Sequence, residues 1–96
     1  MSELLAQSLA LPCGARLRNR LAKAAMTEGL ADPAGIPTAE LNRLYGLWSD
    51  GGAGLLLSGN ILVDGDHLER PGNVIIDREP DAALQAALSR WAAAAT

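Results

Sequence analysis

The sequence contains no phenylalanine, a single cysteine and few aromatic residues among its 96 positions. Because Cys13 stands alone, neither an intramolecular disulfide nor a cysteine-based zinc site can form within this chain. The aromatic residues are Tyr45, Trp48 and Trp91, and they offer little of the stacking surface that single-stranded nucleic acids use. Since the net charge is −3 as well, we expect no nucleic-acid partner.

Long apolar runs and a basic N-terminal start are also missing. No stretch approaches the roughly 20 apolar residues of a membrane span, and residues 1–5 lack the positive charge of a secretion signal. We therefore expect a cytoplasmic protein with no membrane partner. The 49% of hydrophobic and 20% of charged residues are typical of a globular chain rather than a disordered one.

Helical spacing of apolar residues predicts two helices. The first is expected to begin after Thr38 as N-cap and to stop at Gly51 and Gly52. Its apolar positions follow the i, i+3, i+4, i+7 pattern at Leu41, Leu44, Tyr45 and Trp48. The second is expected to carry Pro80 in its first turn. Its apolar stripe consists of Leu84, Leu88, Trp91 and Ala95, and both tryptophans are predicted to be core residues.

Four stretches of sequence predict strands. Residues 16–21 alternate polar and apolar side chains, which indicates a half-buried strand or hairpin. Residues 21–27 and 54–63 are mostly apolar, as in strands that are covered on both faces of a parallel sheet. A short strand is expected at residues 74–77, after a polar loop at residues 64–73.

The resulting order of strand, helix, strand, loop and helix predicts an α/β fold with a parallel sheet. Two helices cannot cover both faces of such a sheet, and its edge strands would stay unpaired. We therefore expect residues 1–96 to form the opening portion of one larger α/β domain, incomplete as given.

Four segments, taken in order, are similar to the N-terminal part of the Old Yellow Enzyme family of flavin-dependent oxidoreductases, including its 2,4-dienoyl-CoA reductase-like branch. They are the Leu-Arg-Asn-Arg-Leu run at 17–21, the Ala-Ala-Met-Thr run at 24–27, the helix with Gly-Gly-Ala-Gly at 41–54, and residues 55–63 with the His-Leu-Glu-Arg-Pro-Gly-Asn loop at 67–73. The resemblance extends over nearly the whole chain.

This resemblance implies a (β/α)8 TIM barrel with FMN at its C-terminal mouth, of which the chain supplies about two to three βα units. It further implies NAD(P)H as reductant, with hydride passing through flavin N5 to an activated alkene as the small-molecule substrate. Because ligands of such barrels meet the C-terminal ends of strands, the residues implied to bind the cofactor are Ala25, Met26, Thr27, Gly59 and Asn60. No catalytic residue is expected in this segment, and a homo-oligomer is possible.

Roles follow for the individual positions from the same resemblance. The Thr27 hydroxyl is implied to contact the flavin near O4 and N5, and Ala25 and Met26 to supply backbone and packing contacts. At Gly59 a side chain would collide with the isoalloxazine. The residues themselves leave two alternatives open, because Thr27 could satisfy a strand end and Gly59 could form a bulge. Ala25 departs from the family, in which many members carry Pro.

Other candidate sites carry simpler interpretations. The only histidine, His67, is expected to be a surface residue, and the acidic residues 64, 66 and 69 a solvated loop rather than a metal site. Thr27 replaces the cysteine of one family branch, and Gly29 falls where some members place a tyrosine.

The alternative function is a non-enzymatic, short α/β barrel remnant in self-association or partner binding. In either case, the isolated chain is predicted to be inactive.

Overall fold

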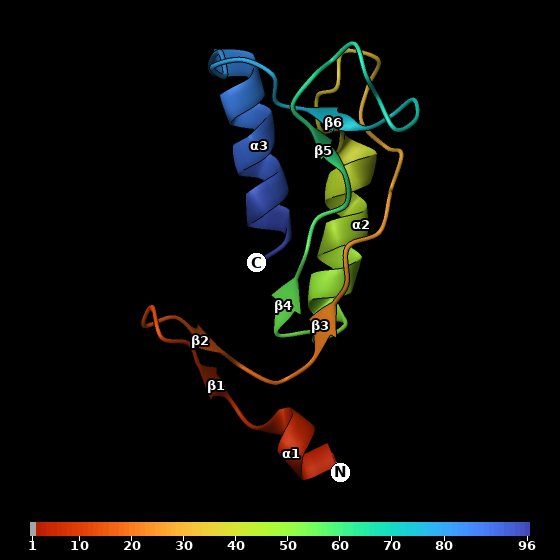
Figure 1. Ribbon diagram of the computed structural model, residues 1–96. Coiled ribbons are helices and arrows are strands. Elements are labelled where there is room, and N and C mark those ends of the chain that lie inside the picture. Colours follow the sequence, from red (N-terminus) through yellow and green to blue (C-terminus); the bar gives the residue numbers. More distant parts are fainter. Residues whose placement is uncertain (1) are drawn as a thin grey trace.

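A computed structural model describes residues 2–96, which form three helices and six short strands (Figure 1). The helices are α1 (Ser2–Ala6), α2 (Ala39–Asp50) and α3 (Ala82–Ala94). The strands are β1 (Leu9–Ala10), β2 (Arg16–Leu17), β3 (Ala22–Lys23), β4 (Leu55–Leu56), β5 (Ile61–Leu62) and β6 (Val74–Ile75). No helix within these residues is long and apolar enough to cross a membrane.

Three strand pairs define the topology. β3 pairs with β4 in parallel, with Ala22 opposite Leu55, and β5 pairs with β6 in parallel, with Ile61 opposite Val74. Since α2 connects β3 to β4, the predicted βαβ unit is confirmed. β1 and β2 form an antiparallel hairpin instead. This hairpin and α1 lie at the end of the molecule opposite β5 and β6 (Figure 1); neither α1 nor β1 was indicated by the sequence pattern.

The Leu-Arg-Asn-Arg-Leu run connects the N-terminal strands to the C-terminal end of α2 and the turn after it by hydrogen bonds. Arg18 donates from Nη2 to the carbonyl oxygens of Ser49 and Ala53, at 3.0 and 3.2 Å. Asn19 donates from Nδ2 to the Gly52 carbonyl at 2.6 Å. A side chain on Gly54 would meet the Asn19 carbonyl oxygen at 2.7 Å, so this turn approaches the segment between β2 and β3 more closely than any residue but glycine allows.

Capping residues set the ends of the two long helices. As predicted, Thr38 caps α2, and its Oγ1 accepts from the Leu41 amide at 3.2 Å. α3 begins differently from the prediction, because Asp81 is its N-cap and accepts from the Leu84 amide at 2.9 Å. Pro80 therefore precedes the helix instead of entering its first turn. Asp81 has an extended backbone and a carboxylate acceptor, which is the stronger start signal.

The core lies where α2 and α3 pack against each other and against the strands (Figure 1). It is centred on Leu41, Tyr45, Val74 and Trp91, all of them buried. The Tyr45 ring meets the Trp91 ring edge-to-face at a centroid separation of 5.3 Å, a geometry favoured by aromatic quadrupoles. The core prediction is confirmed for Trp91, while Trp48 is half-buried at the edge of this cluster.

The apolar strands are covered on one face only, as expected of an opening portion whose two helices cannot cover both faces of the sheet. The run at 54–63 is two strands, β4 and β5, and its alternate residues Leu55, Leu57, Ile61 and Val63 are exposed. The run at 21–27 is paired only at β3, and Met26 is 50% exposed. The reason is that α2 and α3 cover one face of the strands, where Leu56 packs on the core, and nothing in residues 2–96 covers the other.

Candidate functional site

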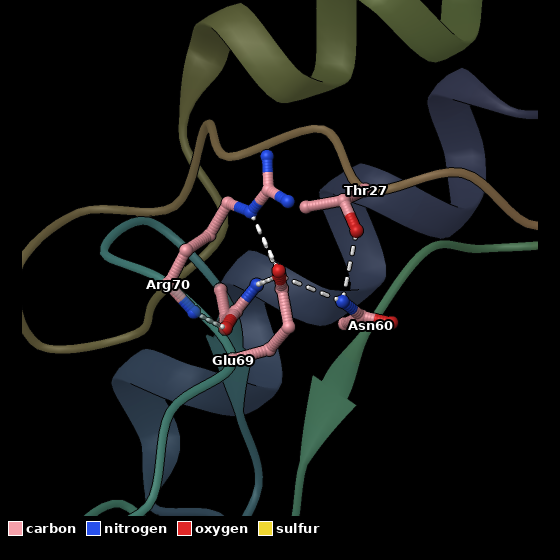
Figure 2. Close-up of polar contacts among 5 residues, drawn as sticks. Thr27, Asn60, Glu69 and Arg70 are labelled. Atoms are coloured by element: carbon pink, nitrogen blue, oxygen red, sulfur yellow. Dashed lines mark hydrogen bonds and ion pairs between the residues drawn. The ribbon is translucent and has the colours of Figure 1, made fainter.

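The carboxyl ends of the parallel strands bring together residues from two distant parts of the chain. Thr27 follows β3, and Asn60 lies between β4 and β5. Asn60 donates from Nδ2 to the Thr27 Oγ1 at 2.8 Å, although 33 positions separate the two residues (Figure 2). Two of the five predicted cofactor-binding residues are therefore in direct contact. Their contact with a flavin stays a prediction.

The other three predicted site residues lie on the same strand ends. Ala25 and Met26 are exposed, and Gly59 packs against the chain at Met26. A Cβ atom on Gly59 would overlap the carbonyl oxygen of Met26 and come within 2.5 Å of the Glu28 Oε1. The requirement for glycine at this position is therefore explained by packing inside the protein, in addition to the flavin contact that the family resemblance implies.

A polar network extends from Asn60 into the loop before β6. The Asn60 Nδ2 also donates to Glu69 Oε1 at 3.0 Å, and Arg70 Nε donates to both Glu69 oxygens at 2.9 and 2.7 Å (Figure 2). Buried Asn73 accepts from the Arg70 amide at 2.9 Å. The hydrogen bond from Arg70, assisted by those from Asn73 and Asn60, lowers the pKa of the Glu69 carboxyl. Glu69 is exposed in its loop, as predicted, and in addition joins Asn60 to Arg70 at this edge.

A second network fixes the strand ends from the side of α2. The Glu28 carboxylate accepts from the Tyr45 hydroxyl and, at 3.0 Å, from the Gly59 amide. The Lys23 ammonium lies 5.3 Å from the centroid of the Tyr45 ring and 4.6 Å from that of Trp48, within cation–π range. Burial raises the pKa of the Tyr45 phenol, and the hydrogen bond to the Glu28 carboxylate raises it further. No sequence pattern indicates this network beyond the helical position of Tyr45.

Beside this polar edge lies a largely apolar pocket of about 450 Å³. It opens between the loop after β3 and the loop before β6, and its lining includes Gly29, Pro33, Leu68, Pro71 and Asn73. Asn73 therefore borders both the pocket and the Glu69 network. A small apolar molecule could enter here next to the strand ends, where ligands of α/β barrels bind.

The remaining candidates lie on the surface. The His67 ring pairs with the Asp64 carboxylate at 2.8 Å, and both side chains are exposed. Within residues 2–96, no three histidine, cysteine or acidic side chains are grouped as a metal site requires. Cys13 is exposed in the turn between β1 and β2.

Curated relatives share sequence with the chain over almost its full length. A protein of Hypocrea jecorina described as NADH-dependent flavin oxidoreductase iliE is 37% identical over 94 residues, which are 96% of this chain and 23% of that protein. The iliE protein of Neonectria sp. is 37% identical over 87 residues, 90% of this chain and 11% of that protein. The chain thus spans less than a quarter of the length of these relatives. No family model matches it.

Solved structures show the same fold. A variant of NCR from Zymomonas mobilis superposes with a TM-score of 0.77 at 22% identity, covering 95% of this chain and 28% of that one. Morphinone reductase gives a TM-score of 0.75 at 22% identity, covering 95% and 22%. Both are TIM-barrel proteins, so the described residues correspond to part of such a barrel, as an α/β chain with one uncovered strand face should.

Proposed function

From the membership of this chain in the Old Yellow Enzyme family of flavin oxidoreductases, we propose that it forms one wall of the flavin site of an NADH-dependent oxidoreductase. Residues 1–96 are then part of an FMN-binding TIM-barrel domain. The observation that carries the proposal is the meeting of Thr27 and Asn60 at the carboxyl ends of parallel strands, because barrel enzymes place their ligands at that end.

The residues at these strand ends fit a flavin in their donor chemistry. A hydroxyl can donate one hydrogen bond and accept two. Thr27 accepts from Asn60, and within residues 2–96 its own hydrogen has no acceptor. Ala25 and Met26 are small or flexible and are exposed beside it. This surface therefore offers a polar donor next to apolar packing, as the edge of a flat, partly polar ring requires.

The chemistry that a bound flavin supplies is hydride transfer at N5, from reduced nicotinamide to the β-carbon of an activated alkene. In this proposal Thr27 would donate its hydroxyl hydrogen to the flavin, and Ala25 and Met26 would supply backbone and packing contacts to it. Gly59 keeps the strand ends close enough together for these contacts. The proton donor and the substrate-anchoring groups are expected outside residues 1–96.

The uncovered strand face is consistent with a barrel of which residues 1–96 form only a part. Leu55, Leu57 and Val63 are exposed on that face, and further strands would bury them in the barrel interior. We propose that residues 1–96 alone bind FMN weakly or not at all and do not turn over. A stable dimer of the isolated chain that covers the same face would favour the non-enzymatic alternative.

The test is to purify the intact gene product and identify the bound flavin by absorbance and mass. We expect one FMN per protein, with reduction by NADH in the absence of oxygen. Thr27→Ala should weaken FMN binding, whereas Thr96→Ala, the same change at the end of the chain where the hydroxyl bonds only Ala93, should not. An intact product that binds no flavin, or equal effects of the two substitutions, would refute the proposal.

A further inference from the structure

We infer that Asn60 is a positioning residue, which turns the Thr27 hydroxyl into a hydrogen-bond donor toward the flavin, and that Glu69 fixes Asn60 for this purpose. The inference rests on the proposed function and changes the role expected for Asn60, which becomes an indirect one. It follows from counting the donors and acceptors of three side chains that are joined in one chain of hydrogen bonds (Figure 2).

The Asn60 amide uses both of its hydrogens inside the protein. Nδ2 donates to Thr27 Oγ1 at 2.8 Å and to Glu69 Oε1 at 3.0 Å. An amide nitrogen carries two hydrogens and accepts none, so the hydrogen between Asn60 and Thr27 belongs to Asn60. The hydroxyl hydrogen of Thr27 must then point elsewhere. Because it finds no acceptor in residues 2–96, it is available to a ligand at the strand ends.

Glu69 determines the orientation of the Asn60 side-chain amide. A carboxylate only accepts hydrogen bonds, so the nitrogen of Asn60, and not its oxygen, must face Glu69. With the amide reversed, Oδ1 would lie against the carboxylate and would also accept the Thr27 hydrogen, leaving the hydroxyl with no donor for a ligand.

Glu69 is itself held in place by two neighbours. Arg70 Nε contacts both carboxylate oxygens, at 2.9 and 2.7 Å, and the buried Asn73 places Nδ2 at 3.5 Å from Oε1. The hydrogen bond from Arg70 also lowers the pKa of Glu69, which favours the carboxylate form that accepts from Asn60. The direction of the Thr27 hydroxyl is thus set by a loop that follows Asn60 by nine positions.

The direction of the Thr27 hydroxyl affects how easily a bound flavin is reduced. Reduction adds electron density to the flavin, and a donor at the ring edge stabilises it, whereas an oxygen lone pair at the same place repels it. Reversing the Thr27 hydroxyl should therefore lower the midpoint potential of the bound flavin. A residue that only supported the fold would change stability and leave the potential alone.

The experiment is a double-mutant cycle in the intact, flavin-loaded protein, read out by midpoint potential and FMN dissociation constant. Thr27→Val removes the hydroxyl with little change in shape, and Asn60→Ala removes the amide that orients it. We expect Thr27→Val to lower the potential and to raise the dissociation constant about 2- to 10-fold, the equivalent of one hydrogen bond. Asn60→Ala, which leaves the hydroxyl in place without its orienting donor, should shift both quantities in the same direction by a smaller amount. The double variant should show no further change beyond Thr27→Val.

Further variants separate the orienting effect of Asn60 on the Thr27 hydroxyl from the effect of an added charge and from a failure to fold. Asn60→Asp presents only acceptors to Thr27, so it should lower the potential in the wild-type background by more than in the Thr27→Val background, where only its charge acts. Glu69→Gln retains an oxygen that can accept from Asn60, and should stay closer to wild type than Glu69→Ala. If Asn60→Ala does not fold, the Asn60→Asp arm answers the same question.

The outcomes distinguish this inference from the proposed function. Equal shifts from the Asn60 substitutions in the wild-type and Thr27→Val backgrounds would mean that Asn60 contacts the flavin directly, which overturns the inference and leaves the proposed function standing. Unchanged potentials in all Asn60 and Glu69 variants would also overturn it. Absence of flavin from the wild-type protein would overturn both.

Discussion

Replacing Gly59 by alanine tests whether this glycine is required by the protein itself or only by a bound flavin. The new Cβ would overlap the Met26 carbonyl oxygen and approach Glu28 Oε1 to 2.5 Å. The carboxylate end of Glu28 can move, but the Met26 oxygen belongs to the backbone of the strand end. Overpacking against a part that cannot yield costs about 1–3 kcal/mol, and we expect Gly59→Ala to lower the free energy of unfolding by that amount.

The measurement is urea unfolding of the intact protein after removal of its flavin, so that only internal contacts count. Gly46→Ala is the matched control. Gly46 lies within α2, where a Cβ would meet only the Ala94 carbonyl oxygen at 3.8 Å, and alanine favours a helix by about 0.5–1 kcal/mol over glycine. The same chemical change should therefore destabilise at one site and stabilise at the other.

A flavin-free Gly59→Ala protein as stable as the wild type would refute the packing argument. In that case the substitution should act only on FMN affinity, as expected if a side chain at this position merely collided with the ring. A loss of stability without flavin together with weaker FMN binding would show that one glycine serves both the strand ends and the ligand.

Three further changes have defined outcomes. Tyr45→Phe leaves the Glu28 carboxylate without its phenol donor and should cost about 1.5–3 kcal/mol near neutral pH. Because the pKa of Tyr45 is raised in the folded protein, the free energy of unfolding of the wild type should fall above the ordinary tyrosine pKa of 10.0. The difference in the free energy of unfolding between wild type and Tyr45→Phe should therefore narrow there, as measured by urea titrations at several pH values. Thr38→Ala removes the N-cap of α2 and should cost about 1 kcal/mol by thermal unfolding. Leu41→Ala at a fully buried site should cost about 2–5 kcal/mol, against about 0.5 or less for Leu47→Ala, whose side chain is 60% exposed; similar losses would contradict the assigned core.

The helices could be read from the sequence because local signals determine them. Thr38, the apolar stripe of α2 and Gly51 all act within one segment, so the capping and the buried face were predicted together. α3 was predicted with its first turn displaced, since Pro80 and Asp81 both favour a helix start and only the backbone decides between them. The uncovered strand face was also expected, because two helices are too few to cover both faces of a sheet. Which residues of each apolar run lie on that face depends on what packs there rather than on the strand itself.

The site was predictable in position but not in its connections. Parallel strands place their carboxyl ends together, so Thr27 and Asn60 could be expected at one edge. No local pattern pairs Glu69 with Asn60 or Glu28 with Tyr45, because these contacts join loops and a helix across 9 and 17 positions. Acidic residues in polar loops are usually solvated, and the structural role of these two becomes visible only when their partners are in place.

The two networks together explain why the strand ends form a defined surface without a ligand. Glu28 binds the Tyr45 hydroxyl and the Gly59 amide on the side of α2, while Glu69 binds Asn60 on the side of the loop. Each carboxylate thus holds one residue of the Gly59–Asn60 pair, and Asn60 in turn contacts Thr27. A ligand that meets this edge finds its donor already oriented, so binding does not have to order it. The loop before β6 accordingly belongs to the site as much as the strands do.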